Sequence, residues 1–200
     1  MTHQDDQGHL NAIRSGDRTR LTPLLRAHQR RLYTLCLRVL GHHEDAADAA
    51  QDALIQIIEN IDRFEGRSQL STWMSRIAIN RALTLLRKRK SRPTLQLTGP
   101  GDSDRPDLAL ADSREPDPTL RVEQEEQTRQ LANALNALEE RFRVVLVLRD
   151  IEGMNYDEIA TTTGLAIGTV KSRIFRARLA LRQALDDAET RSDQREGAHG

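Results

Sequence analysis

The stretch 156–178 constrains the fold more than any other part of the chain, because its spacing is typical of two helices joined by a tight turn. Ala160 is small enough for a second helix to cross the first closely. Gly164 follows four residues later, where the turn needs a positive φ that glycine adopts without steric cost. Val170 is placed to pack back on the first helix. These positions predict a helix-turn-helix of the kind that binds DNA.

The second helix of this motif has an apolar side and a polar side. At about 100° per residue, the apolar residues fall together: Val170, Ile174, Ala177 and Leu181. The opposite side and its flanks carry polar, cationic and aromatic residues: Thr169, Lys171, Ser172, Phe175 and Arg176. Cations can donate to guanine O6 and N7, and an aromatic ring can touch a thymine methyl, so this side suits a DNA groove. One alternative is an ordinary solvated helix in an αα-hairpin, and another is that Phe175 packs on a neighbouring helix.

The charge of the chain is balanced, with 30 Lys and Arg against 30 Asp and Glu, but it is unevenly distributed. A basic block covers 87–92, and the stretch 102–126 is rich in acids. Zero net charge does not exclude a nucleic-acid partner, because the distribution of charge matters more than the total. Aromatic residues make up only 3% of the chain. Aliphatic residues must therefore form the core, which favours an all-α fold.

The single cysteine, Cys36, excludes an internal disulfide and fits a reducing compartment. It lies in the apolar run 32–37, so we expect a buried thiol rather than a nucleophile. The start of the chain does not resemble a signal peptide, and no apolar run is long enough to span a membrane. These features predict a cytoplasmic protein without membrane insertion.

Five of the six prolines lie between 93 and 119, together with glycines and acids. This composition predicts a flexible linker between two small helical domains. We therefore expect domains at 10–92 and 120–186, joined by the linker 93–119.

Apolar periodicity and breaker residues predict the helices of each domain. Residues 1–16 are polar and expected to be loose, and Gly41 is expected to end the first helix. Helices are expected at about 21–40, 44–61, 71–89, 120–138 and 139–151, before the helix-turn-helix.

The helix expected at 44–61 has an apolar stripe: Ala47, Ala50, Leu54, Ile58 and Ile61. Acids and amides point the other way: Asp45, Asp48, Asp52, Gln56 and Glu59. A metal site at 42–45 is a weaker interpretation, because adjacent ligands at the start of a helix are a weak signal. No metal and no cofactor are expected.

The helix expected at 71–89 turns its apolar residues inward: Met74, Ala78, Ala82 and Leu85. The opposite side combines polar and basic residues with the only tryptophan: Trp73, Arg76, Asn80, Thr84 and Arg87. An aromatic residue among cations is suited to stacking on unpaired bases. The alternative is that Trp73 packs against the preceding loop and Asn80 caps a turn.

With both halves in this order, the chain resembles bacterial sigma factors of the extracytoplasmic-function type, the minimal two-domain class. Residues 45–54 resemble the helix that docks on the clamp of RNA polymerase. Residues 64–80 and the basic block resemble the segment that melts promoter DNA and binds the −10 element. Residues 138–146, 153–160 and 168–178 resemble the −35 domain.

The resemblance implies a protein without an active site that directs promoter recognition, melting and transcription initiation by core RNA polymerase. It implies polymerase contacts from four residues: Asp48, Gln51, Asp52 and Gln56. It implies −10 contacts from Phe64, Trp73, Arg76, Asn80, Arg87 and Lys88, and −35 contacts from Lys171, Ser172, Arg173, Phe175 and Arg176. Core RNA polymerase and promoter DNA are the expected partners, and an anti-sigma factor is a candidate partner.

Three positions depart from the pattern of these factors. Ile57 and Ile58 stand where an aromatic residue is common, and Thr84 stands where an acid often precedes the basic block. A transcriptional regulator that acts without polymerase is the main alternative, but it needs only the second domain. An enzyme with Asp45, Asp48 and Asp52 around Mg²⁺ is a further alternative; these acids have no glycine-rich loop or catalytic histidine beside them.

Overall fold

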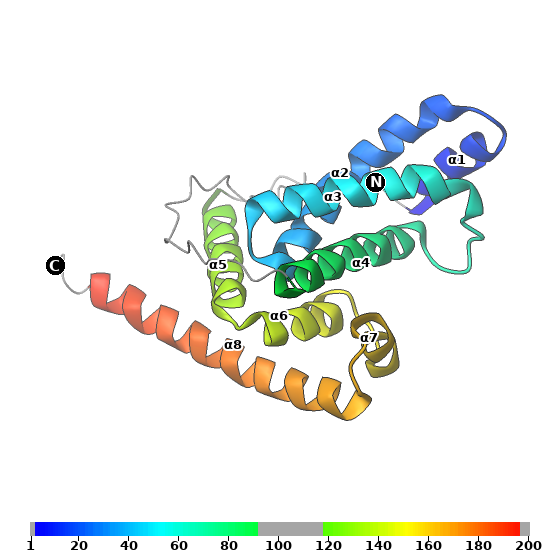
Figure 1. Cartoon of the computed structure of the whole chain (residues 1–200). Helices are drawn as coiled ribbons and strands as arrows, with labels where there is room; N and C mark the ends of the chain where they lie inside the picture. The colour runs from blue at the N-terminus through cyan, green and yellow to red at the C-terminus, as the bar shows by residue number, and fades with distance from the viewer. Residues whose placement is uncertain (1–2, 92–117, 197–200) are drawn as a thin grey trace.

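The computed structural model describes the backbone of residues 3–91 and 118–196, and the regular structure in these two ranges is entirely helical (Figure 1). This confirms the all-α prediction. The predicted linker 93–119 lies outside the described residues except for its last two, which begin α5 (Pro118–Ala137). We call 3–91 the N-terminal body and 118–196 the C-terminal body.

The N-terminal body is built on three long helices that pack on one another: α2 (Leu21–Leu40), α3 (His43–Asn60) and α4 (Leu70–Ser91). Two single turns of 3-10 helix precede α2 and follow α3: η1 (Arg18–Arg20) and η2 (Ile61–Arg63). Gly41 ends α2 as predicted, with φ 76° and its N–H on the Leu37 carbonyl at 2.7 Å. Met74, Ala78 and Ala82 of α4 are fully buried, also as predicted.

Alanines bring α3 close to its neighbours. Its buried residues are Ala46, Ala49, Ala50, Ala53 and Ile57. The predicted stripe is therefore wrong in part: Ala47 and Ile58 are exposed and Leu54 is only half-buried, whereas Ala50 and Ile61 are buried as expected.

Residues 3–14 form a helix, contrary to the prediction that residues 1–16 are loose. They form α1 (His3–Arg14), which packs on α2 and buries Leu10 and Ile13 in the core. Asp6 of α1 meets His28 of α2 in a buried contact, with Oδ1 and Nε2 2.9 Å apart. The N-terminal body thus begins before the predicted domain start at 10.

The C-terminal body consists of α5, α6 (Glu140–Leu146), the π-helical turn η3 (Val147–Ile151), α7 (Tyr156–Thr163) and α8 (Ile167–Glu196). The apolar run 144–148 is buried as expected, and Gly153 follows it with φ 68°. Asn155 caps α7: its side chain accepts from the Glu158 N–H, and the Glu158 carboxylate accepts from the Asn155 N–H, each at 2.9 Å. This reciprocal cap fixes the start of the helix-turn-helix.

The two bodies pack against each other, with α6 and α5 on α2. Figure 1 shows α6 and α7 below α4, and α8 along the lower edge of the molecule. Arg143 of α6 reaches the C-terminal end of α2, where its guanidinium donates to the carbonyls of Val39 and Leu40 at 3.3 and 3.0 Å.

Two further sequence predictions can be compared with the fold. Cys36 is fully buried, as expected, and its thiol is free. Of the helices in the described ranges, none has the length and apolar character needed to cross a bilayer.

Candidate nucleic-acid interface

The two helices of the helix-turn-helix, α7 and α8, are joined by a turn that contains a glycine with positive φ. Gly164 has φ 73° and its N–H bonds the Ala160 carbonyl at 2.8 Å, so the chain reverses at the predicted position. Val170, Ile174 and Ala177 are buried against the rest of the body, which confirms the predicted inward side of α8; Leu181, further along, is half-buried.

The outward side of α8 is open to solvent. Phe175 has 73% of its surface exposed, and Lys171, Ser172 and Arg176 are exposed as well. Arg173 is half-buried at the edge of this side. An exposed phenyl ring among cations is not explained by packing within the described residues, so the alternative in which Phe175 packs on a neighbouring helix is wrong.

The ring of Tyr156 on α7 contacts two cations next to the outward side of α8. These contacts were not predicted from the sequence. The Lys171 ammonium lies 5.7 Å from the centre of the Tyr156 ring, and the Arg149 guanidinium lies 5.0 Å from it. Such contacts hold a cation over the ring face. In the sequence, the aromatic Tyr156 at the start of the helix-turn-helix is the feature that could have indicated these contacts.

Arg178 of α8, by contrast, forms an ion pair within the C-terminal body. It pairs with Asp150 through Nε and Nη2 at 3.0 and 2.6 Å, and this carboxylate raises the pKa of the guanidinium. Lys171 and Arg176, near the first turns of α8, are exposed, as is Arg182 further along the helix.

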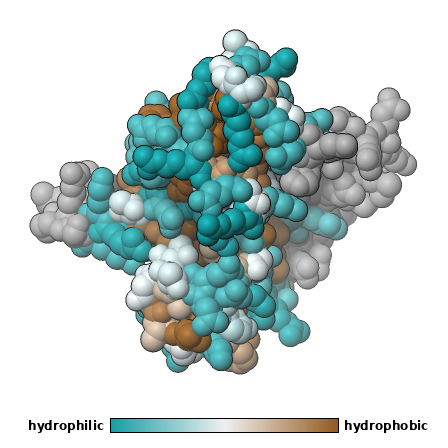
Figure 2. Space-filling view, turned by 90° about the vertical axis from the view of Figure 1, so that its right-hand side faces the viewer, coloured by the Kyte–Doolittle hydropathy of each residue, from teal (hydrophilic) through white to brown (hydrophobic). Residues whose placement is uncertain are grey.

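Figure 2 looks onto the side of the molecule that lies at the right of Figure 1. This face is mainly hydrophilic, with hydrophobic patches at its lower end, where Figure 1 places the turn between α7 and α8. Ile167, exposed at the first position of α8, adds apolar surface to that turn.

The polar side of α4 forms the second candidate surface. Arg76, Asn80, Arg87 and Lys88 are exposed on it. The Thr84 hydroxyl donates to the Asn80 carbonyl at 2.7 Å, so the Thr84 side chain turns back on its own helix. The orientation predicted for Arg76, Asn80 and Arg87 is confirmed.

Trp73 and Phe64 form one aromatic pair at the start of this surface. Their ring centres lie 5.3 Å apart with an angle of 46° between the planes. Phe64 is buried and Trp73 half-buried. Trp73 thus packs against the preceding loop, as the alternative interpretation held, while part of its ring still faces solvent.

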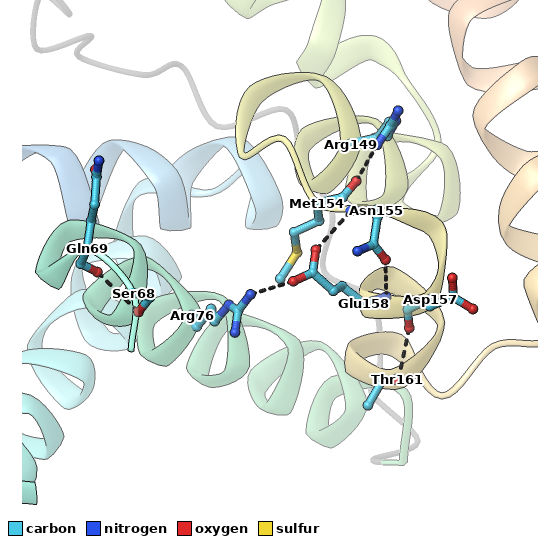
Figure 3. Close-up of polar contacts among 9 residues, drawn as sticks. All are labelled: Ser68, Gln69, Arg76, Arg149, Met154, Asn155, Asp157, Glu158 and Thr161. Atoms are coloured by element: carbon cyan, nitrogen blue, oxygen red, sulfur yellow. Dashed lines mark hydrogen bonds and ion pairs between the residues drawn. The ribbon is translucent and has the colours of Figure 1, made fainter. Parts of the chain in front are cut away.

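The C-terminal body covers part of the α4 surface. Arg76 Nη2 lies 2.5 Å from Glu158 Oε1 on α7, and Arg87 Nη2 donates to the Thr162 carbonyl at 3.1 Å. Figure 3 shows Arg76 reaching from α4 to the same Glu158 that caps α7. Asn80 and Arg76 line a cleft of about 320 Å³ whose far wall is α7; we call it the α4–α7 cleft.

A third surface lies on α3. Asp48, Gln51 and Asp52 are exposed, as predicted, while Gln56 is half-buried and accepts from Arg81 Nε at 2.9 Å. Ile55 and Ile58 are exposed to 49% and 41% beside these acids. The predicted stripe missed this apolar component, although the spacing of the two isoleucines puts them together on a helix.

Two of the residues near the start of α3, His43 and Asp45, contact other side chains. His43 Nδ1 lies 2.8 Å from the Tyr33 hydroxyl, and Asp45 pairs with Arg89 at 2.6 Å. Within residues 3–91 and 118–196, no group of three or more His, Cys, Asp or Glu is arranged to hold a metal ion.

Comparisons with known families match both bodies. Residues 24–92 match the family Sigma-70 region 2, and residues 128–181 match Sigma-70, region 4. The chain is 34% identical over 187 residues to the RNA polymerase sigma-H factor of Pseudomonas aeruginosa, covering 92% of this chain and 96% of that one. It is 32% identical over 182 residues to the ECF RNA polymerase sigma factor SigW of Bacillus subtilis, covering 89% and 95%.

A solved structure is similar as well. It is the sigma factor RpoE of Bartonella quintana in complex with the anti-sigma factor NepR, with 26% identity and a TM-score of 0.54. The similarity covers 82% of this chain and 96% of that chain, so it extends over both bodies.

Proposed function

Since the chain belongs to the extracytoplasmic-function type of the sigma-70 family and acts in promoter recognition and initiation with RNA polymerase, we propose how its surfaces divide this work. The family is non-catalytic, so the polymerase carries out the chemistry. We propose a polymerase- and −10-binding domain at 10–92, extended to include α1, a linker at 93–119, and a −35-binding domain at 120–186.

In this proposal the outward side of α8 binds the −35 element as duplex DNA. The observation that carries it is the exposed Phe175 between exposed cations on the second helix of a helix-turn-helix. Second helices of this motif enter the major groove with their N-terminal residues. The proposed contacts are Lys171, Ser172, Arg173, Phe175 and Arg176.

The polar side of α4 binds the melted −10 element. Asn80 offers both a donor and an acceptor to the edge of an extruded base, and the half-exposed Trp73 offers a stacking surface. Phe64 supports Trp73 from below, since its own ring is buried. Arg76, Arg87 and Lys88 neutralise the backbone of the opened strand. Extruding a base costs a few kcal/mol, which these contacts offset.

The exposed side of α3 docks on core RNA polymerase. Asp48, Gln51 and Asp52 supply polar contacts, and Gln56 holds the helix to α4 through Arg81. Ile55 and Ile58 supply apolar surface next to them. A polar rim around a small apolar centre is the usual anatomy of a protein interface.

The packing of the two bodies against each other limits the access of DNA to α4. Although Asn80 is exposed to solvent, α7 lines the α4–α7 cleft beside it and Glu158 of α7 pairs with Arg76. A DNA strand can therefore lie along α4 only after the bodies separate. We propose that docking on polymerase separates them in the cytoplasm, where transcription takes place. An anti-sigma factor is a further proposed partner, by analogy with the relative solved in complex with NepR.

A run-off transcription screen tests the proposal. Purified core polymerase is incubated with fragmented genomic DNA, with and without the chain, and new transcripts are mapped. We expect discrete start sites that need the chain. A regulator acting without polymerase would bind DNA fragments yet produce no chain-dependent start sites with core polymerase alone, and this outcome would reject the proposal.

A further inference from the structure

The helix α1 is a fixed part of the N-terminal body although it precedes the family match that starts at residue 24. Leu10 and Ile13 are almost fully buried in the core. Asp6 and His28, both buried, hold the helix to α2 at 2.9 Å. A helix held by apolar contacts and a buried polar pair has a defined position, and so has its last residue, Arg14.

Two arginines, Arg14 at the end of α1 and Arg18 in η1, reach the segment between α3 and α4. Arg14 Nη2 donates to the carbonyl of Phe64, and Arg18 Nη2 pairs with Asp62 at 2.5 Å. Both members of the Arg18 pair are about half exposed, so water and salt screen it. The Arg14 contact is partly buried and directed at a backbone carbonyl, which makes it the more specific of the two.

Phe64 is the residue at which the chain leaves the core. Its ring packs on Trp73, its N–H bonds the Ile61 carbonyl at 3.1 Å, and its carbonyl accepts from Arg14. Residues 65–69 are all exposed, and Leu70 is buried again. The Phe64 carbonyl and the Glu65 N–H belong to one rigid peptide plane. Fixing that carbonyl therefore sets the direction in which the exposed segment 65–69 departs.

We infer that Arg14 is a positioning residue for Phe64 and the segment that follows it, and through the Phe64–Trp73 pair for the choice of base at the −10 element. This inference rests on the proposed role of Trp73 and the α4 surface in −10 binding. Arg14 touches neither DNA nor polymerase in this account. It acts through the backbone carbonyl of Phe64, whose ring forms the aromatic pair with Trp73.

The test uses holoenzyme reconstituted from core polymerase and the full chain. The template is a promoter found in the run-off screen, prepared as two libraries: one with randomised −10 bases and one with randomised −35 bases. Sequencing of the transcribed templates gives the base preference at each position. In the Arg14→Ala holoenzyme we expect the preference for the best −10 base to fall by about threefold to tenfold, the range expected for one lost hydrogen bond. The −35 preference should stay as in the unsubstituted protein.

Two further variants keep the result interpretable. Arg20→Ala removes a nearby exposed arginine that pairs with Asp17, at 3.3 Å, and should leave both preferences unchanged. Arg14→Lys keeps a cationic donor and should recover part of the −10 preference even if Arg14→Ala lowers stability. Unchanged −10 preference in the Arg14→Ala holoenzyme, or an equal loss in Arg20→Ala, overturns the inference. Failure of the unsubstituted chain to start transcription would instead overturn the proposed function.

Discussion

Arg143 shows at the scale of a single residue how the two bodies are joined. Only 7% of its surface is exposed, and it donates to carbonyls at the end of α2 and, at 3.3 Å, to the Asn136 carbonyl of its own body. Burial lowers the pKa of this guanidinium. The C-terminal end of a helix favours a cation, because its last carbonyls lack partners within the helix. Arg143 therefore caps a helix of the other body.

Replacing this residue should destabilise the chain. Arg143→Met keeps most of the side-chain volume but leaves the Val39 and Leu40 carbonyls without this donor. We expect the free energy of unfolding to fall by about 1.5–3 kcal/mol, as for lost hydrogen bonds to charged groups. Urea denaturation measures it. Arg141→Met, at an exposed neighbouring arginine, is the control; equal midpoints for the two variants would contradict the capping role.

A second prediction for a single residue concerns Arg176 and its proposed contact with the −35 element. It is exposed on the outward side of α8. If it contacts a base edge, Arg176→Ala should weaken −35 binding by about 1–3 kcal/mol and relax the preference at one position. Competition between −35 variants for holoenzyme measures this, with Arg182→Ala further along α8 as control. Equal weakening for every −35 sequence would assign Arg176 to the phosphate backbone.

At the scale of elements, α3 carries the prediction for polymerase docking. Asp48 and Asp52 are exposed one turn apart, so reversing both leaves the core intact. Asp48→Arg with Asp52→Arg should keep the far-UV circular dichroism spectrum and weaken binding to core polymerase at least about tenfold, through like-charge repulsion at the interface. The matched reversal of Asp186 and Asp187, which are exposed on α8, should have no such effect. Undiminished binding would move the docking surface away from this side of α3.

The elements also show what the sequence could predict and why the rest escaped. The bounds of α2 and the inward sides of α4 and α8 followed from apolar periodicity, because their polar and apolar residues are well separated. In α3 alanines and isoleucines occur nearly all round, so the pattern leaves the packing side undetermined. The helices that pack on α3 decide which of its sides is buried, and that side carries Ala46, Ala49 and Ala53.

Tertiary contacts account for the other differences. The segment 3–14 is mostly polar, and its order depends on Leu10, Ile13 and the Asp6–His28 contact, all made with distant residues. Phe64 lies between the helices expected at 44–61 and 71–89, but it is buried because its ring packs on Trp73. The cleft between α4 and α7 joins residues 82 positions apart, which no local pattern indicates.

At the scale of the whole molecule, the packing of the two bodies predicts a movement on polymerase binding. Dyes attached to Gln29→Cys on α2 and Gln183→Cys on α8 report the separation of the bodies. Cys36 stays unlabelled at neutral pH, because it is buried and burial raises the pKa of its thiol to about 12. We expect energy transfer to fall when core polymerase is added. Unchanged transfer at saturating polymerase would contradict separation of the bodies.

Opening of the −10 region tests the account most directly, because it requires both the α4 surface and docking on polymerase. Asn80 is exposed in the middle of α4, where asparagine is a poor helix former, and it lines the α4–α7 cleft. The measurement is permanganate reactivity of −10 thymines in a promoter bound by holoenzyme, with Asn133→Ala, at an exposed position of α5, as control. We expect Asn80→Ala to lose most of this reactivity while −35 binding persists. Normal −10 reactivity in the Asn80→Ala holoenzyme would contradict it.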